Sequence, residues 1–301
     1  MSPAEGVVTR EPGHPPLGAH VSVAGGLPTA PERGLRIGAE VLQIFSKPGT
    51  RWMGRALEEE EAAAFRRESE RTGVPTAAIH CAYLINLGSA KEAVRTRSLY
   101  ALEDEASRAA MLGVPYIVMH PGSCGEDPEE TVIARIAEAL RRFGKFPAGV
   151  TLLLENTAGQ GNSIGRTVEQ LRRLIDAAGA PADVAVCLDS AHLFQGGYDI
   201  SGERGWKELL EQLGRFRLLP LVRMWHLNDS KTGLGSRVDR HQHIGKGNIG
   251  IPAFRRIMGQ PEFRDLPMIL ETPKDGGDEF EMDVRNLETL RNAMRKRKGT
   301  R

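Results

Sequence analysis

Seven histidine and carboxylate side chains lie at the ends of short apolar segments that are far apart in the sequence. They are His20, His80, His120, Glu155, Asp189, His226 and Glu271. Imidazole and carboxylate without thiolate are the usual ligands of a catalytic Zn²⁺, and Mn²⁺, Fe²⁺ and Co²⁺ accept the same groups. The residue types therefore predict a divalent metal centre, provided that the fold brings these positions together.

Two further segments extend the candidate ligand set. They are Asp189-Ser190-Ala191-His192, at the end of one apolar run, and Asp239-Arg240-His241 in a polar stretch. Residues two apart in an extended segment face the same side, so Asp239 and His241 could bind one ion, with His192 as a third ligand. The candidates exceed the needs of one or two ions, which favours three ions with Glu155 bridging two of them. The nine are His80, His120, Glu155, Asp189, His192, His226, Asp239, His241 and Glu271.

The apolar segments themselves predict strands that alternate with helices. Eight apolar runs, at 17–23, 40–45, 76–81, 116–122, 150–156, 184–190, 222–229 and 267–272, alternate with helix-like segments at 28–37, 57–72, 90–112, 128–143, 166–179, 204–219, 251–259 and 280–298. Nearly continuous apolar strands are buried on both faces and pair in parallel. Eight such units predict an α/β fold, a single-domain (β/α)8 TIM barrel, whose strands all end on one face where the candidate ligands would meet.

Composition sets the wider limits. The 301 residues contain 40 Lys and Arg against 39 Asp and Glu, with 3 Cys, and no apolar run approaches the ~20 residues of a membrane span. We expect a soluble, cytoplasmic protein without a disulfide framework and without a membrane partner. Residues 1–16 are expected to be a disordered leader, 17–294 the barrel domain, and 295–301 a disordered basic tail. Near-neutral net charge gives no sign of a nucleic-acid partner.

Seven motifs in order resemble the endonuclease IV family of apurinic/apyrimidinic endonucleases. They are GAHVSVAGGL, IHCAYLINLGS, HPGS, LLENTAGQG, CLDSAHLFQGGYDI, HLNDSKTGLGSRVDRHQHIGKGNIG and ILETP, between about residues 17 and 273. The resemblance implies a TIM barrel with three zinc ions per chain, with Mn²⁺ possible at some sites. It also implies base excision repair of double-stranded DNA: the phosphodiester 5′ to an abasic site is hydrolysed, leaving a 3′-hydroxyl and a 5′-deoxyribose phosphate.

Position by position, the resemblance implies a role for each candidate ligand. The first zinc would be held by His80, His120 and Glu155, the second by Glu155, Asp189, His226 and Glu271, and the third by His192, Asp239 and His241. A hydroxide between the first two ions would attack the phosphorus, and the third ion would stabilise the leaving oxygen. Glu155 and Glu271 are the candidate catalytic residues, with Glu271 accepting the proton of the attacking water.

Candidate DNA contacts lie in the loops on the same face. Tyr83-Leu84 matches a pair that enters the duplex in the family; packing on top of the barrel is the alternative. The segment 46–52 departs from the family, since Gly49-Thr50 replaces the frequent Gln-Arg. Arg51 and Trp52 could substitute, although Trp52 could equally be loop packing. The candidate phosphate contacts are Lys47, Lys231, Arg237, Arg240, Lys246 and the basic tail.

Two rival functions remain at this stage. A metal-dependent sugar isomerase or epimerase on the same barrel would use one or two ions and would have no use for His192, Asp239 and His241. A non-catalytic barrel that binds DNA or metal is the second rival. For the endonuclease we expect a monomer with no obligatory protein partner. We also expect His20 to hydrogen-bond to a ligand or to a phosphate, and Cys187 to lie in the core.

Overall fold

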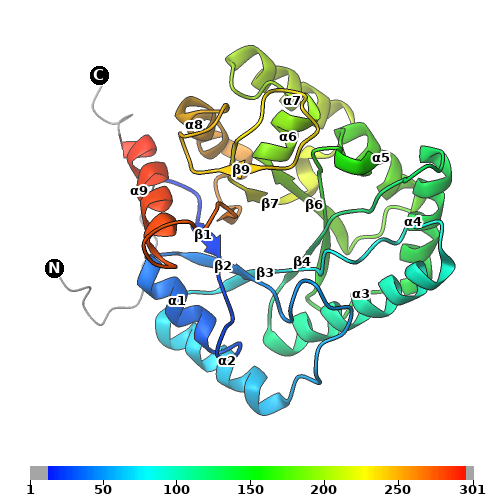
Figure 1. Ribbon diagram of the computed structural model, residues 1–301, viewed down its shortest axis with the longest axis horizontal. Helices are drawn as coiled ribbons and strands as arrows, with labels where there is room; N and C mark the ends of the chain where they lie inside the picture. Colours follow the sequence, from blue (N-terminus) through cyan, green and yellow to red (C-terminus); the bar gives the residue numbers. More distant parts are fainter. Residues whose placement is uncertain (1–12, 296–301) are drawn as a thin grey trace.

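Within residues 13–295, the part of the chain that the computed structural model describes, eight parallel strands close into one barrel (Figure 1). Around the barrel the order is β1-β10-β7-β6-β5-β4-β3-β2. The bounds are β1 Leu17–His20, β2 Val41–Ile44, β3 Thr76–His80, β4 Tyr116–Met119, β5 Thr151–Glu155, β6 Val184–Asp189, β7 Val222–His226 and β10 Met268–Leu270. The predicted single-domain (β/α)8 barrel is confirmed.

Helices surround the barrel in the positions predicted for them. They are α1 Thr29–Ile37, α2 Glu59–Thr72, α3 Glu92–Leu112, α4 Glu129–Phe143, α5 Val168–Ala177, α7 Glu203–Arg215, α8 Ile251–Gly259 and α9 Glu281–Arg295. Their buried residues recur at helical spacing, as Val132, Ile136 and Leu140 do in α4, so each helix packs one apolar face on the strands. α5 begins with a capping box in which Thr167 and Gln170 each accept a hydrogen bond from the other's backbone N–H.

Two small elements were not predicted, and both lie at the carboxyl ends of the strands. α6 Ser190–Gly196 follows β6 directly, and the antiparallel pair β8 Asp229–Ser230 and β9 His241–Gln242 follows β7. Every residue of α6 is buried, so the helix has no polar face for a sequence pattern to show. Asp189 ends β6 and caps α6 by accepting a hydrogen bond from the His192 N–H. Three single-turn 3₁₀ helices complete the described part: Gln160–Asn162, Leu219–Leu221 and Pro261–Phe263.

The core has an inner and an outer part. Side chains of the strands fill the barrel interior, among them Val118, Leu153, Cys187 and Ile269, which confirms the prediction for Cys187. A larger apolar cluster lies between strands and helices. Among the described residues, no helix has both the length and the apolar character needed to cross a membrane.

The first described residues pack against the barrel. His14 and Pro15 are buried, and the Met268 N–H donates to the Pro16 carbonyl oxygen at 2.9 Å. The prediction of a disordered leader is therefore wrong for residues 14–16, because their backbone extends the contact between β1 and β10. The remainder of the predicted leader, and the predicted tail beyond Arg295, lie outside the described residues.

Candidate metal centre

The fold brings the predicted ligands together at the carboxyl ends of the strands. They form three groups, and within each group one ligand atom per residue lies within 4.8 Å of the others. The groups are His80, His120 and Glu155; Glu155, Asp189, His226 and Glu271; and Asp189, His192 and His241. Glu155 and Asp189 each belong to two groups, so the three groups form one continuous centre.

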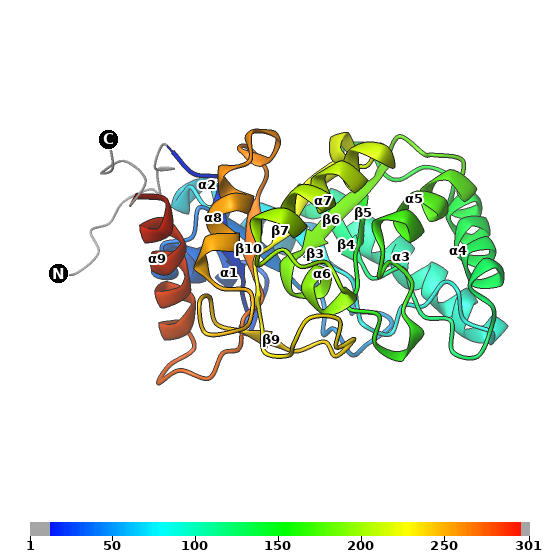
Figure 2. The ribbon, with the colours of Figure 1, turned by 90° about the horizontal axis from the view of Figure 1, so that it is seen from above.

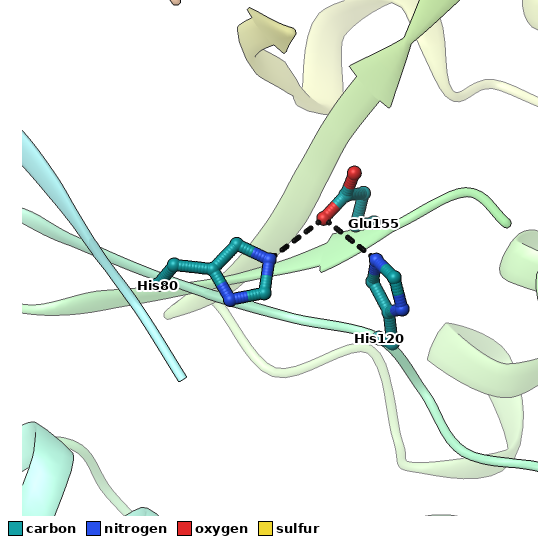
Figure 3. Close-up of side chains that lie close together, drawn as sticks. All are labelled: His80, His120 and Glu155. Atoms are coloured by element: carbon teal, nitrogen blue, oxygen red, sulfur yellow. Dashed lines mark ion pairs between the residues drawn. The ribbon is translucent and has the colours of Figure 1, made fainter. Parts of the chain in front are cut away.

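The first group joins the ends of β3, β4 and β5. Glu155 Oε2 lies 3.3 Å from His80 Nε2 and 3.2 Å from His120 Nε2, and both rings point at this oxygen (Figure 3). The His80 Nδ1–H donates to the Cys81 carbonyl oxygen at 2.8 Å, which leaves the Nε2 lone pair facing the carboxylate. Glu155 Oε2 is fully buried and, among the described residues, has no hydrogen-bond partner. A cation between these three atoms would satisfy all of them.

The second group surrounds the ring of His226. Its Nδ1 lies 3.0 Å from Glu155 Oε1, 3.2 Å from Glu271 Oε2 and 3.9 Å from Asp189 Oδ2. Burial by itself raises the pKa of Glu155, yet the imidazoles of His226 and His120 hold that pKa well below its usual range. The Glu155 carboxylate therefore remains charged in a region that excludes water. Several buried negative charges around one imidazole require a compensating cation.

The third group combines α6 with the long loop after β8. Asp239 Oδ1 lies 3.2 Å from His192 Nε2 and 3.4 Å from His241 Nε2, and the two Nε2 atoms are 3.4 Å apart. Both Nδ1 atoms are engaged by carbonyl oxygens, that of Asn156 at 2.9 Å and that of Glu271 at 3.0 Å. Each ring thus presents Nε2 to the centre, as a metal ligand would. Asp239 thus lies beside His192 and His241, although the carboxylate that belongs to the third group itself is Asp189.

The loop that carries Asp239 and His241 is held by a carboxylate that sequence reasoning missed. Figure 2 shows this loop, with β9, beside α6 at one edge of the molecule. The buried Asp229 accepts hydrogen bonds from the backbone N–H groups of Ser230, Gly245 and Ile249, at 2.8, 2.9 and 2.9 Å. Gly245 has a φ of 76°, a conformation that favours glycine. Gly245 therefore helps to shape the loop that follows His241.

Polar side chains in the barrel mouth orient the ligands and were also missed, except for His20. Asn228 Nδ2 donates to Asp189 Oδ2 at 2.6 Å, and Asn228 Oδ1 accepts from the Glu271 N–H at 2.8 Å. Gln43 Nε2 lies 2.6 Å from Glu271 Oε1 and 3.0 Å from His20 Nδ1. His20 Nδ1 is itself 3.4 Å from Glu271 Oε1. The only sequence signal was a glutamine within one apolar run and an asparagine near the end of another.

The predicted DNA contacts have different surroundings. Tyr83 and Leu84 are 67% and 37% exposed, and the Tyr83 ring lies edge-on to that of Phe45, with 5.3 Å between centroids. Most of the predicted cations are exposed, namely Arg51, Lys231, Arg237, Arg240 and Lys246. Trp52 is half-buried and packs against the core, which favours the loop-packing interpretation.

Lys47 does not lie where we expected it. Its side chain is buried, and Nζ lies 2.7 Å from Asp104 Oδ2 and 2.8 Å from Glu105 Oε1. The ammonium group is enclosed by carboxylates of α3 and is not available to a phosphate. The prediction that Lys47 contacts DNA is therefore corrected to a structural role.

A cavity of about 240 Å³ opens over the three groups. Tyr83 and Lys274 line it together with His80, His120, Asp239 and Glu271. A larger cavity of about 720 Å³ adjoins it between the loops after β1 and β2, with His20, Phe45 and Lys274 in both linings. The smaller cavity is lined by side chains of the candidate metal ligands, so a substrate bound in it would lie next to the metal groups.

Comparisons with known proteins agree with this geometry. Residues 32–296 match the family model described as xylose isomerase-like TIM barrel. A relative named probable endonuclease 4, from Geobacter sulfurreducens, is 46% identical over 286 residues, which cover 93% of this chain and 95% of the relative. Another of that name, from Chloroflexus aurantiacus, is 42% identical over 92% of this chain and 97% of its own length.

Solved structures give the same result. The crystal structure of endonuclease IV from Thermus thermophilus superposes with a TM-score of 0.81 at 38% identity, covering 94% of this chain and 100% of that one. A D-psicose 3-epimerase superposes with a TM-score of 0.62 at 17% identity, a likeness that concerns the fold alone.

Proposed function

The chain belongs to the endonuclease IV family of the xylose isomerase-like TIM barrels, and from this premise we propose that it is a DNA-repair endonuclease acting at abasic sites. It hydrolyses the phosphodiester 5′ to the apurinic or apyrimidinic site in double-stranded DNA, leaving a 3′-hydroxyl and a 5′-deoxyribose phosphate. It acts as a cytoplasmic monomer in base excision repair and needs no protein partner.

The observation that carries this proposal is the convergence of five histidines and three carboxylates in three groups at the barrel mouth, with a fourth carboxylate, Asp239, beside the third group. The buried Glu155 oxygen without a hydrogen-bond partner among the described residues fits a cation between it and two imidazoles. His80, His120 and Glu155 would hold one Zn²⁺, Glu155, Asp189, His226 and Glu271 a second, and His192, Asp239 and His241 a third. Bound there, Zn²⁺ supplies acidified water and neutralises charge on the phosphoryl and leaving oxygens; Mn²⁺ could replace it at some sites.

Glu271 is the side chain that receives the proton from water. It follows β10 directly, its backbone N–H donates to Asn228, and its carboxylate accepts a hydrogen bond from Gln43. Nearby imidazoles, that of His226 foremost, overcome the effect of burial and lower the pKa of Glu271. The carboxylate is therefore ionised and can accept a proton, and the contacts with Asn228 and Gln43 fix its orientation before substrate arrives. Glu155 fixes the spacing of the first two groups, because each of its oxygens serves one of them.

The exposed side chains around the cavity bind the duplex. Tyr83 lines this cavity, the next residue Leu84 is exposed, and both offer apolar surface to the gap left by a missing base. The exposed cations named above, Arg51, Lys231, Arg237, Arg240 and Lys246, contact phosphates, which carry the affinity but not the specificity. A half-buried Trp52 supports the loop without entering DNA. The basic tail, most of which lies outside the described residues, adds non-specific attraction.

The sugar epimerase alternative is not favoured by this site. That function would leave His192, Asp239 and His241 without a role, whereas these side chains lie within 3.4 Å of one another. The Asp229 contacts that hold their loop would be equally unexplained.

The test is cleavage of a duplex with a single tetrahydrofuran abasic analogue. We expect a nick on the 5′ side of the analogue, with a 3′-hydroxyl end that a DNA polymerase can extend, and no cleavage of the matched undamaged duplex. Treatment with a chelator should abolish cleavage, and added Zn²⁺ should restore it. An intact abasic duplex after incubation with zinc-loaded protein would contradict the proposal.

A further inference from the structure

Gln43 is a fully buried amide in the mouth of the barrel. The function proposed above gives it no role in binding metal or DNA. It lies on β2 between apolar neighbours, in register with His20 of β1 and Ala78 of β3. A polar side chain in such a place costs stability unless each of its hydrogen-bonding groups has a partner. Its partners are therefore informative.

The contacts of Gln43 fix the orientation of its amide. One end lies 2.6 Å from Glu271 Oε1, an ionised carboxylate oxygen that can only accept, so this end is the NH₂ group. The same NH₂ lies 3.0 Å from His20 Nδ1. The other end is then Oε1, and it lies 2.9 Å from His226 Nε2. Two donors and one acceptor of the amide are all engaged.

This orientation decides which nitrogen of His226 is free. Because Gln43 Oε1 can only accept, the hydrogen of His226 must be on Nε2. Nδ1 is then the nitrogen left to bind an ion, and it is the atom that faces Glu155, Asp189 and Glu271. A histidine ligand is ordinarily held in this way, by an acceptor on the nitrogen that does not bind metal.

We infer that Gln43 is a positioning residue that holds His226 and Glu271 together in the geometry of the second metal group. The amide oxygen of Gln43 sets the tautomer of His226, and its NH₂ group sets the orientation of the Glu271 carboxylate. This inference rests on the proposed function, and it adds to it a residue that contacts neither DNA nor metal. His20 contributes by keeping the NH₂ of Gln43 in place.

The test compares Gln43→Met with the matched variant Gln170→Met. Met has about the volume of Gln but offers no N–H and no amide oxygen. Gln170 also uses its amide fully, at the start of α5 and on Glu129, but it lies away from the metal groups. The measurements are Zn²⁺ affinity by competition with a chromogenic chelator, kcat and KM on the abasic duplex, and Tm with and without Zn²⁺.

We expect Gln43→Met to lose about 10–100-fold in Zn²⁺ affinity or kcat, the usual effect of removing such a partner, with KM unchanged. The gain in Tm on adding Zn²⁺ should shrink in this variant. Gln170→Met should lower Tm equally with and without Zn²⁺ and leave the affinity and kcat at the wild-type values. A purely structural role for Gln43 predicts this second pattern for both variants and would overturn the inference.

Gln43→Glu provides a second test that conserves volume. It keeps an oxygen for His226 but replaces the NH₂ by a second carboxylate oxygen against Glu271. We expect kcat to fall in Gln43→Glu, and this test remains available if Gln43→Met does not fold. Wild-type kcat together with wild-type Zn²⁺ affinity in Gln43→Glu would overturn the inference. Absence of Zn²⁺ binding or cleavage in the wild-type protein would instead overturn the proposed function, and this inference with it.

Discussion

Two clusters of charged side chains lie beside β2 and β3, and they balance their charges differently. In the first, which we name the α3 charge network, Lys47 and Arg108 meet Asp104 and Glu105. The Ser46 hydroxyl donates to the remaining Glu105 oxygen at 2.6 Å. Two cations neutralise two carboxylates, so the network is complete with the protein's own side chains.

The metal centre is the opposite case. Four carboxylates, Glu155, Asp189, Asp239 and Glu271, face imidazoles whose other nitrogens are largely engaged by acceptors. Glu155 Oε2 has no hydrogen-bond partner among the described residues. The comparison teaches that burial of charge does not by itself mark a functional site. What marks it is a set of ligand atoms that needs cations from outside.

The largest effect is expected from the general base of the metal centre. Glu271→Gln keeps the size of the side chain and should keep metal and DNA binding, yet turnover should fall by about 10²–10⁴-fold, the usual contribution of a general base. Single-turnover cleavage of the abasic duplex measures it, with DNA binding by the same variant as the control. Cleavage at nearly the wild-type rate would show that Glu271 is not the base.

The α3 charge network should matter for stability and not for metal binding. Lys47→Met leaves the carboxylates of Asp104 and Glu105 with only Arg108, and breaking a buried pair costs about 3–5 kcal/mol. Urea unfolding of the chelator-treated protein measures this loss. Lys231→Met, at an exposed lysine, is the control and should stay within about 0.5 kcal/mol of the wild type. If the Lys47→Met protein is as stable as the control but has a raised KM for DNA, Lys47 contacts a phosphate and the structural role is wrong.

Tyr83 tests whether exposed apolar surface at the rim serves DNA. Removing a ring that stacks on a base costs about 1–3 kcal/mol of binding, so Tyr83→Ala should bind the abasic duplex roughly tenfold or more weakly. Tyr100→Ala removes an equally exposed ring from α3, 59% exposed against 67% for Tyr83, and should bind normally. Equal binding by both variants in a fluorescence anisotropy titration would assign Tyr83 to loop packing.

The smallest effect is expected from a single phosphate contact. Arg240→Ala should weaken binding to abasic and intact duplexes alike and reduce the slope of log K against log salt by about 1. Arg204→Ala, on α7 and exposed, is the control and should leave the slope unchanged. An unchanged slope in the Arg240 variant would remove this residue from the DNA interface.

The sequence predicted the barrel and the convergence of the candidate ligands because both depend on local patterns. Most candidate ligands end a strand or follow one closely, and parallel strands end on one face. Asp239 was instead grouped with His241 by their spacing of two residues. α6 was missed because a short, fully buried helix shows no periodicity. Lys47 was misplaced because its burial depends on α3, far along the chain, and Gln43 and Asp229 were missed because only tertiary contacts reveal what a buried amide or carboxylate holds.

The central claim is that the metal centre needs three ions to cleave abasic DNA, and a reconstitution titration tests it most directly. Zn²⁺ is added in steps to chelator-stripped protein, and the rate of cleavage of the abasic duplex is measured at each ratio of metal to chain. We predict that activity is absent without metal and reaches its full value only at about three equivalents. Full activity in the stripped protein, or a plateau at one equivalent, would contradict the account.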